Sequence, residues 1–324
     1  MEYRQVGTTG LRISAIALGS WLTYGGPAVT QERAIGLVHR AYELGVNYFD
    51  TADMYQLGAA EELLRRALDS IPRESVVLAT KAFWPVGGGP NDRGLSRKHV
   101  FESVNRSLRR LGTDYVDMFF CHRFDPEVPL EETLSTLNHL VTAGKVLYLG
   151  VSEWGAPSIE RALGLQAASG WDPVRVSQPC YNMLHRNIEE AVIPTCDRAG
   201  IGQVVWSPLA EGFLTGKYRA GEPAPQGSRA ADKRLASAIG DYMTAANYAR
   251  VERLGRVAEQ AGMPLARLAL AWTLRSTSVA SAIIGATRLE QLEENVLAAD
   301  VRLGDDVLAA VDEVLIDGVP AHAQ

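Results

Sequence analysis

Short runs of apolar residues recur along the chain, and each is followed by a longer segment in which apolar residues return every three or four positions. The short runs are almost continuously hydrophobic, which is typical of parallel strands buried on both faces. The longer segments have the period of amphipathic helices. The predicted strands are ISAIALG (13–19), VNYFD (46–50), VVLATK (76–81), YVDMFFCH (115–122), VLYLGVS (146–152), VRVSQ (174–178), GQVVWS (202–207) and SAIIG (281–285).

The helical segments carry residues that are typical of helix ends. Thr30 is a predicted N-cap, and Gly45 is the predicted stop of the same helix. Ser96 and Gly112 bound a second helix in the same way. The remaining predicted helices cover residues 129–145, 157–168, 188–199, 248–260 and 290–299.

The alternation of strands and helices determines the predicted fold class. Eight strand–helix units predict an α/β protein, and specifically a closed (β/α)8 TIM barrel rather than an open sheet. Residues 3–14 resemble a short N-terminal β-hairpin before the first barrel strand. Residues 82–96 and 208–238 interrupt the alternation and are predicted to be long loops on the C-terminal face. Because no linker or low-complexity stretch divides the chain, residues 1–324 are expected to form a single domain.

Composition and charge exclude several classes of partner. The chain is 47% hydrophobic and 22% charged and has a formal net charge of −6, so we expect no nucleic-acid partner and no direct membrane insertion. The cysteines Cys121, Cys180 and Cys196 are an odd number without C-x-x-C spacing, as expected in a reducing compartment. No leader-like apolar segment opens the chain, which predicts a cytoplasmic protein.

Polar side chains close several of the predicted strands. Asp50, Lys81 and His122 end three successive strands, and in a closed barrel these ends meet at one mouth. A single strand-end lysine or histidine is more often solvated or structural, but three in succession argue for a site. Tyr55, on the loop after Asp50, can reach the same mouth. Three further strands end at Ser152, Gln178 and Ser207.

This set of residues suits proton transfer to a carbonyl oxygen. A tyrosine hydroxyl has an ordinary pKa of ~10, and a nearby ammonium such as Lys81 lowers that pKa. Asp50 can hold Lys81 in its charged form, and His122 can donate a second hydrogen bond to the substrate. General acid–base assistance contributes ~10²–10⁴ in rate. In carbonyl reduction, the hydride must then come from a nicotinamide.

Six motifs lie in the order typical of one family and cover essentially the whole chain: GVNYFDTADMYQLGAAEELL, LATK, DYVDMFFCHRFDPEVPLEET, GKVLYLGVSEW, WSPLAEGFLTGKY and IIGATRLEQLEEN. The sequence resembles the aldo-keto reductase superfamily, in the branch of the voltage-gated potassium channel β-subunits and their bacterial reductase relatives. The resemblance implies a barrel enzyme that reduces aldehydes or ketones with NADPH. It makes Tyr55 the proton donor, Lys81 its pKa-lowering partner, Asp50 the support of Lys81, and His122 the residue that orients the carbonyl.

The resemblance also implies a cofactor site for NADPH/NADP+. Trp206 is expected against the nicotinamide ring, and Arg288, near a helix N-terminus, is expected to attract the 2′-phosphate. The NADP preference depends on that arrangement. The expected cofactor contacts are Ser20, Trp21, Asp50, Ser152, Gln178, Trp206, Ser207, Pro208, Leu209, Gly212, Lys217, Arg229, Gly285, Thr287, Arg288, Gln291, Glu294 and Asn295.

Three acidic positions near the predicted site carry no role in carbonyl reduction itself. Glu153 and Glu211 depart from the pattern of the channel β-subunits and add negative charge near an anionic cofactor. Asp53 is predicted to shape the bend or cap a helix, with lining of the site as the alternative.

Two other functions compete with carbonyl reduction. The first is an NADP-binding regulatory or channel-associated subunit with slow turnover. The second, a metal-dependent barrel hydrolase or isomerase, lacks a ligand cluster, and we expect no metal. By analogy with relatives, the protein is expected to be a homo-oligomer, a tetramer or larger. The physiological carbonyl substrate is not encoded in any motif.

Overall fold

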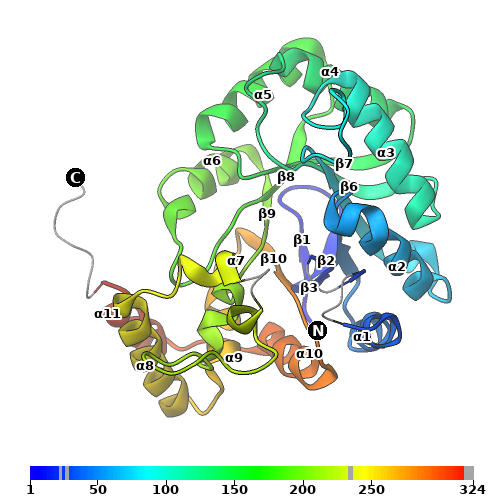
Figure 1. Ribbon diagram of the computed structural model, residues 1–324. Coiled ribbons are helices and arrows are strands. Elements are labelled where there is room, and N and C mark those ends of the chain that lie inside the picture. Colours follow the sequence, from blue (N-terminus) through cyan, green and yellow to red (C-terminus); the bar gives the residue numbers. More distant parts are fainter. Residues whose placement is uncertain (22–23, 26–28, 233–235, 317–324) are drawn as a thin grey trace.

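Eight parallel strands form a closed barrel, and helices surround it (Figure 1). The computed structural model describes residues 1–21, 24–25, 29–232 and 236–316. The barrel strands are β3 (Ile16–Gly19), β4 (Tyr48–Asp50), β5 (Val77–Ala82), β6 (Val116–Cys121), β7 (Val146–Ser152), β8 (Val174–Gln178), β9 (Gly202–Val205) and β10 (Val279–Ile284). They follow one another in chain order, and β10 closes the barrel between β9 and β3. The predicted (β/α)8 barrel is confirmed.

The helices begin and end largely where the sequence predicts. The Thr30 side chain accepts a hydrogen bond from the Arg33 N–H, and the Ser96 side chain accepts one from the His99 N–H. The predicted helix 188–199 is instead split into a 3-10 turn and a shorter α-helix. The α-helices are α1 (Gln31–Glu43), α2 (Ala59–Leu68), α3 (Arg97–Leu111), α4 (Leu130–Thr142), α5 (Ala156–Ser169), α6 (Val192–Ala199), α7 (Ala236–Gly240), α8 (Ala245–Gln260), α9 (Leu265–Thr273), α10 (Leu289–Val296) and α11 (Asp305–Ile316). The 3-10 helices are η1 (Tyr55–Gly58), η2 (Arg73–Ser75), η3 (Asn187–Glu189), η4 (Ala210–Thr215), η5 (Arg229–Ala231) and η6 (Leu297–Asp300).

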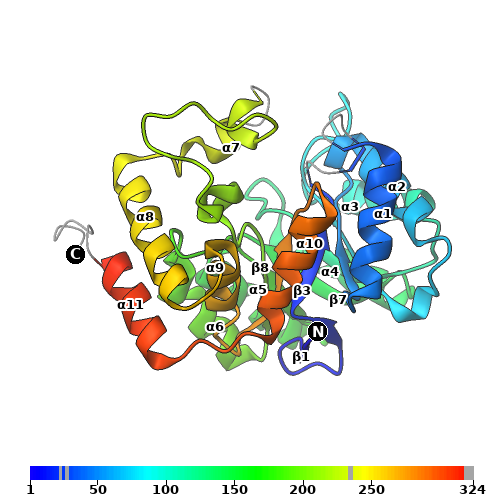
Figure 2. The same ribbon diagram turned by 90° about the horizontal axis from the view of Figure 1, so that it is seen from below.

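An antiparallel hairpin, β1 (Tyr3–Gln5) and β2 (Arg12–Ser14), precedes the barrel as predicted. Residues 13–14 were predicted both in this hairpin and in the first barrel strand, and they lie in the hairpin. The chain turns between β2 and β3, where the Ser14 hydroxyl donates to the Ile16 carbonyl at 2.7 Å. Figure 2 shows the hairpin at one end of the barrel and α7 at the other. The hairpin therefore closes the N-terminal end.

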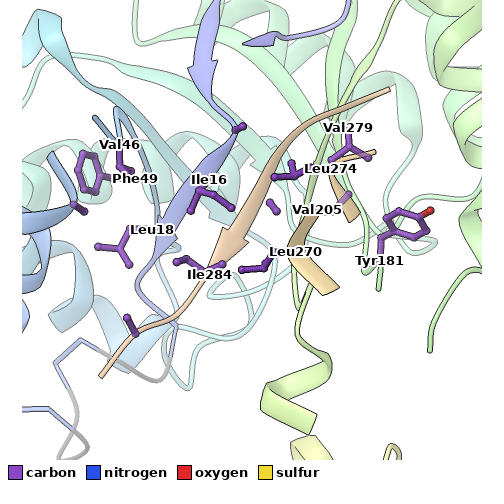
Figure 3. Close-up of a cluster of buried hydrophobic side chains, with 14 of the residues drawn as sticks. Ile16, Leu18, Val46, Phe49, Tyr181, Val205, Leu270, Leu274, Val279 and Ile284 are labelled. Carbon is purple, nitrogen blue, oxygen red and sulfur yellow. The ribbon is translucent and has the colours of Figure 1, made fainter. Parts of the chain in front are cut away.

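The core has two layers because alternate strand residues face opposite sides. Ile16, Leu18 and Ile284 belong to the larger cluster, between the barrel and its helices (Figure 3). Tyr48 and Phe120 belong to a smaller cluster that fills the barrel. The members of this interior cluster are Val6, Ile13, Ala17, Tyr48, Val77, Ala79, Met118, Phe120, Val176, Val204, Ala280 and Ile283.

The long segment after β9 is not structureless. It contains η4, η5 and α7, apart from residues 233–235, which lie outside the described residues. Within the described ranges, no helix combines the length and apolar character needed to cross a bilayer.

Candidate active site

The strand ends surround a pocket of about 750 Å³. Asp50 at the end of β4, His122 after β6 and Gln178 at the end of β8 all line it, together with Tyr55 from η1. The barrel therefore brings these predicted site residues to one mouth.

Lys81 lies at the centre of the predicted catalytic group. Its Nζ donates to Asp50 Oδ1 at 2.5 Å, to the Thr51 carbonyl at 2.8 Å, and to the Tyr55 hydroxyl at 3.3 Å. The Lys81 side chain is fully buried. The other Asp50 oxygen, Oδ2, accepts from the Tyr48 hydroxyl at 3.1 Å and from Gln178 Nε2 at 2.9 Å. A buried charge needs such partners, and here each oxygen of the carboxylate has at least one.

The backbone after β4 carries Tyr55 to this position. The Asp53 N–H donates to the Lys81 carbonyl at 3.1 Å, so the loop runs along the end of β5. Gln56 and Leu57 then adopt left-handed conformations, with φ of 49° and 52°. Left-handed backbone is unfavourable for residues with a Cβ, and such residues tend to cluster at functional sites.

The pKa of Tyr55 differs from the sequence-based expectation. Burial raises the pKa above its usual value, and the Lys81 ammonium, which lowers it as expected, offsets only part of this rise. Burial acts to lower the pKa of Lys81, but Asp50 and Tyr55 raise that pKa overall. Lys81 is therefore charged at neutral pH, and the Tyr55 hydroxyl keeps a proton that it can donate.

His122 is a neutral imidazole in this setting. Burial, followed by the charges of Lys81 and Arg123, lowers its pKa well below the usual value. Its ring lies 5.9 Å from the Tyr55 ring and 6.4 Å from the Trp84 ring, centroid to centroid, in edge-on arrangements. A neutral ring in this place can donate one hydrogen bond to a substrate oxygen.

Every predicted cofactor contact except Ser20 lines the pocket. The Ser20 hydroxyl donates instead to the Thr51 hydroxyl at 2.8 Å, and the residue is buried beside the loop after β4.

Several of these predicted cofactor-contact residues form hydrogen bonds with other residues of the protein. The Thr287 N–H and hydroxyl each donate to Gln291 Oε1 at 3.0 Å. Glu294 accepts two hydrogen bonds of 2.8 Å from Arg267. The Glu294 carboxylate is therefore held in place by a guanidinium, and its charge is matched.

Glu153 and Glu211, the two acidic residues that depart from the pattern of the channel β-subunits, also have hydrogen-bond partners within the protein. Glu153 Oε1 accepts from Trp206 Nε1 at 2.8 Å and from the Cys180 N–H at 2.5 Å. Glu211 forms an ion pair with Arg229 and accepts from the Ser207 hydroxyl at 2.8 Å. One carboxylate therefore fixes the Trp206 indole, and the charge of the other is matched by a guanidinium.

The pocket fits a nicotinamide dinucleotide by its donor set. Lys217 and Arg288 supply positive charge at the side of β9 and β10, and Arg288 is the N-cap of α10. This is a favourable place for a phosphate. The Ser228 hydroxyl also lines the pocket, and it is buried without a hydrogen-bond partner in the described part of the chain. Within those same residues, no group of three or more His, Cys, Asp or Glu side chains could hold a metal ion.

Asp53 does not line the pocket, and it does not cap a helix, because the cap positions are Met54 for η1 and Gly58 for α2. It is buried, and one of its oxygens accepts from the Ser103 hydroxyl of α3. Burial raises the pKa of Asp53 to about 7. Asp53 thus anchors the loop to α3.

Sequence reasoning missed several pocket-lining residues, among them Trp84 and Arg123 near the catalytic group. Each follows a predicted strand-end residue, Lys81 or His122, by one to three positions. Extending the strand-end rule into the first residues of each loop would have found both.

Comparison with known proteins identifies relatives over nearly the whole chain. The model of the aldo/keto reductase family matches residues 15–316. A protein of Arabidopsis thaliana named "Probable voltage-gated potassium channel subunit beta" is 40% identical over 322 residues, which is 97% of this chain and 97% of that protein. The "L-glyceraldehyde 3-phosphate reductase" of Escherichia coli (strain K12) is 36% identical over 327 residues, covering 98% of this chain and 93% of that protein.

Proposed function

The chain belongs to the aldo/keto reductase family and is an oxidoreductase, and we propose that it reduces aldehydes and ketones to alcohols with NADPH. One observation carries this proposal. The Tyr55 hydroxyl lies 3.3 Å from Lys81 Nζ, which in turn lies 2.5 Å from Asp50, at the wall of a pocket large enough for small molecules.

Each member of the group has a role that follows from its environment. Bound NADPH supplies the hydride that the carbonyl carbon receives. Tyr55 donates its proton to the carbonyl oxygen, and the Lys81 charge stabilises the phenolate that remains. Asp50 keeps Lys81 charged and in place. His122, a neutral imidazole, donates a second hydrogen bond and orients the carbonyl.

The direct test is the loss of absorbance at 340 nm when the protein is mixed with NADPH and an aromatic aldehyde. We expect Tyr55→Phe to reduce turnover by roughly 10²-fold or more, because the proton donor is lost, and to leave NADPH binding nearly unchanged. Tyr115→Phe removes a hydroxyl outside the pocket and should have wild-type turnover. Wild-type turnover in Tyr55→Phe would remove this residue from the mechanism.

The preference for NADPH over NADH is assigned to Arg288. Arg288→Ala should weaken NADPH binding by roughly tenfold or more, since a charge-assisted bond to a phosphate is lost, and should affect NADH less. Fluorescence titration with both cofactors measures the difference, and Arg256→Ala on α8 controls for net charge. Equal losses for the two cofactors would show that Arg288 does not contact the 2′-phosphate.

A second candidate function comes from the similarity to a protein named as a channel β-subunit. In that case, the chain would bind NADPH and act as a regulatory or channel-associated subunit with slow turnover. Tight NADPH binding without turnover across a broad panel of aldehydes and ketones would favour it over the reductase.

A further inference from the structure

Arg123 occupies a distinctive place in the pocket. It follows His122 at the end of β6, and its side chain lines the pocket. One guanidinium nitrogen, Nη1, donates to the His122 carbonyl at 2.6 Å, and the guanidinium carbon lies 5.6 Å from the centroid of the Trp84 ring. A guanidinium over an indole is held by cation–π attraction, so the position of Arg123 is fixed before any ligand arrives.

The charge of Arg123 is not matched by a carboxylate. Among the residues that the structure describes, no Asp or Glu oxygen lies within ion-pair distance of its guanidinium. Most acids that line the pocket have cationic partners of their own: Asp50 with Lys81, Glu211 with Arg229 and Glu294 with Arg267. The remaining lining acid, Glu290, belongs to α10, after β10. Arg123 therefore places a positive charge beside the catalytic group without a carboxylate in direct contact.

The barrel order separates Arg123 from the cofactor phosphates. Lys217 follows β9 and Arg288 follows β10, whereas Trp84 and Arg123 follow β5 and β6, which lie across the closed barrel. Tyr55 and His122, whose rings are 5.9 Å apart, lie next to Trp84 and Arg123. The Arg123 guanidinium therefore lies in the same part of the pocket as the Tyr55 hydroxyl, on the side away from Lys217 and Arg288.

We propose that Arg123, backed by the Trp84 ring, binds an anionic group of the substrate, so that the preferred substrates are small carbonyl compounds that carry a carboxylate or a phosphate. This inference depends on the proposed carbonyl reductase function. A guanidinium forms two parallel hydrogen bonds with either oxyanion, which a neutral end group cannot accept in the same way. A partly exposed contact of this kind favours the charged substrate by roughly 10- to 100-fold.

The test compares matched substrates in steady-state reduction with NADPH. One pair is 4-carboxybenzaldehyde and its methyl ester, and the other is glyceraldehyde 3-phosphate and glyceraldehyde. Wild-type protein should show a higher kcat/KM for the charged member of at least one pair, and the pair that responds identifies the preferred oxyanion. Arg123→Gln should bring this ratio close to one, mainly through a higher KM for the charged compound. Arg123→Lys keeps the positive charge but cannot form the two parallel hydrogen bonds, so it should retain part of the preference for the charged substrate.

Arg93→Gln provides the matched control. Arg93 is exposed on the loop after β5 and does not line the pocket, so its removal changes the net charge equally without touching the subsite. The ratio should stay at the wild-type value. Reduction of neutral and charged aldehydes with equal kcat/KM by wild type, or an equal loss for both in Arg123→Gln and Arg123→Lys, would overturn the subsite and leave the reductase function standing. Failure to reduce any of the four compounds would overturn the function itself.

Discussion

The two ends of the barrel are built in opposite ways. At the N-terminal end, the hairpin seals the barrel, and the Arg4 guanidinium donates to the Leu274 and Val279 carbonyls at 2.8 Å each. Gly7 and Gly202 meet there so closely that an added Cβ on either would overlap backbone atoms. Glycines supply the close approach, so this end has little need of strained residues.

The C-terminal end, in contrast, contains strained backbone and buried ionisable side chains. The non-glycine residues with positive φ in the described part of the chain all lie in its loops: Gln56, Leu57, Glu153, Ser207, Ala210 and Glu211. The same end holds the buried Lys81–Asp50 pair and the buried carboxyl of Asp53. Each of these left-handed backbone conformations costs on the order of 1–3 kcal/mol. The comparison shows that the N-terminal end of the barrel contributes stability, whereas the C-terminal end is less stable because its loops position the residues of a pocket.

The largest expected change in stability comes from a substitution at the N-terminal end of the barrel. Gly202→Ala places a Cβ against backbone atoms of Val6 and Gly7, and the hairpin must move to admit it. We expect the free energy of unfolding to fall by roughly 3 kcal/mol, measured by denaturant titration. Gly36→Ala, on a part of α1 with open space, should instead raise it by about 0.5–1 kcal/mol. Equal results for both variants would show that the closed end is not tightly packed.

The next effect concerns Asp53 at the open end. Its folded-state pKa is about 7, far above the ordinary 3.8, so the folded protein holds a proton that the unfolded chain has lost. The stabilising contribution of Asp53 is therefore present at low pH and is lost as the pH rises through 7. Between pH 5 and pH 8, the unfolding free energy of Asp53→Asn should rise by roughly 2–3 kcal/mol relative to wild type. Exposed Asp69→Asn is the control, and a pH-independent difference for Asp53→Asn would contradict the assignment.

The smallest effect measures backbone strain beside Tyr55. Leu57 is 73% exposed and has a φ of 52°, so its side chain contributes little burial and its backbone favours glycine. Leu57→Gly should be more stable than Leu57→Ala by about 0.4–1 kcal/mol in thermal or denaturant unfolding. At Leu147, in the extended strand β7, the same pair should show the opposite order. Greater stability of the alanine variant at both sites would mean that the backbone of η1 is not strained.

Sequence patterning predicted the parts of the molecule that depend on short-range rules. The strand-end positions of Asp50, Lys81 and His122 follow from buried parallel strands, whose ends must meet in a closed barrel. The run 13–19 did not show the turn after Ser14, because the single small hydroxyl of Ser14 is common within strands and no glycine or proline stands next to the turn.

The rest depended on contacts between distant segments. The Ser20 hydroxyl donates a hydrogen bond to the Thr51 hydroxyl. The Trp206 indole donates one to Glu153, a residue 53 positions away in the sequence. No local pattern records those pairings. The raised pKa of Tyr55 depends on how several loops bury it, and the balance between that burial and the Lys81 charge is set only by the assembled mouth.

The separation of β5 and β6 from β9 and β10 has an evolutionary consequence. The side chains we assign to the carbonyl compound lie between residues 50 and 123, and those we assign to the cofactor phosphates lie between residues 207 and 295. A single recombination between two family members, with its crossover near α4, would join the substrate half of one parent to the phosphate half of the other. Such an exchange would replace the proposed substrate contacts and leave the proposed phosphate contacts unchanged.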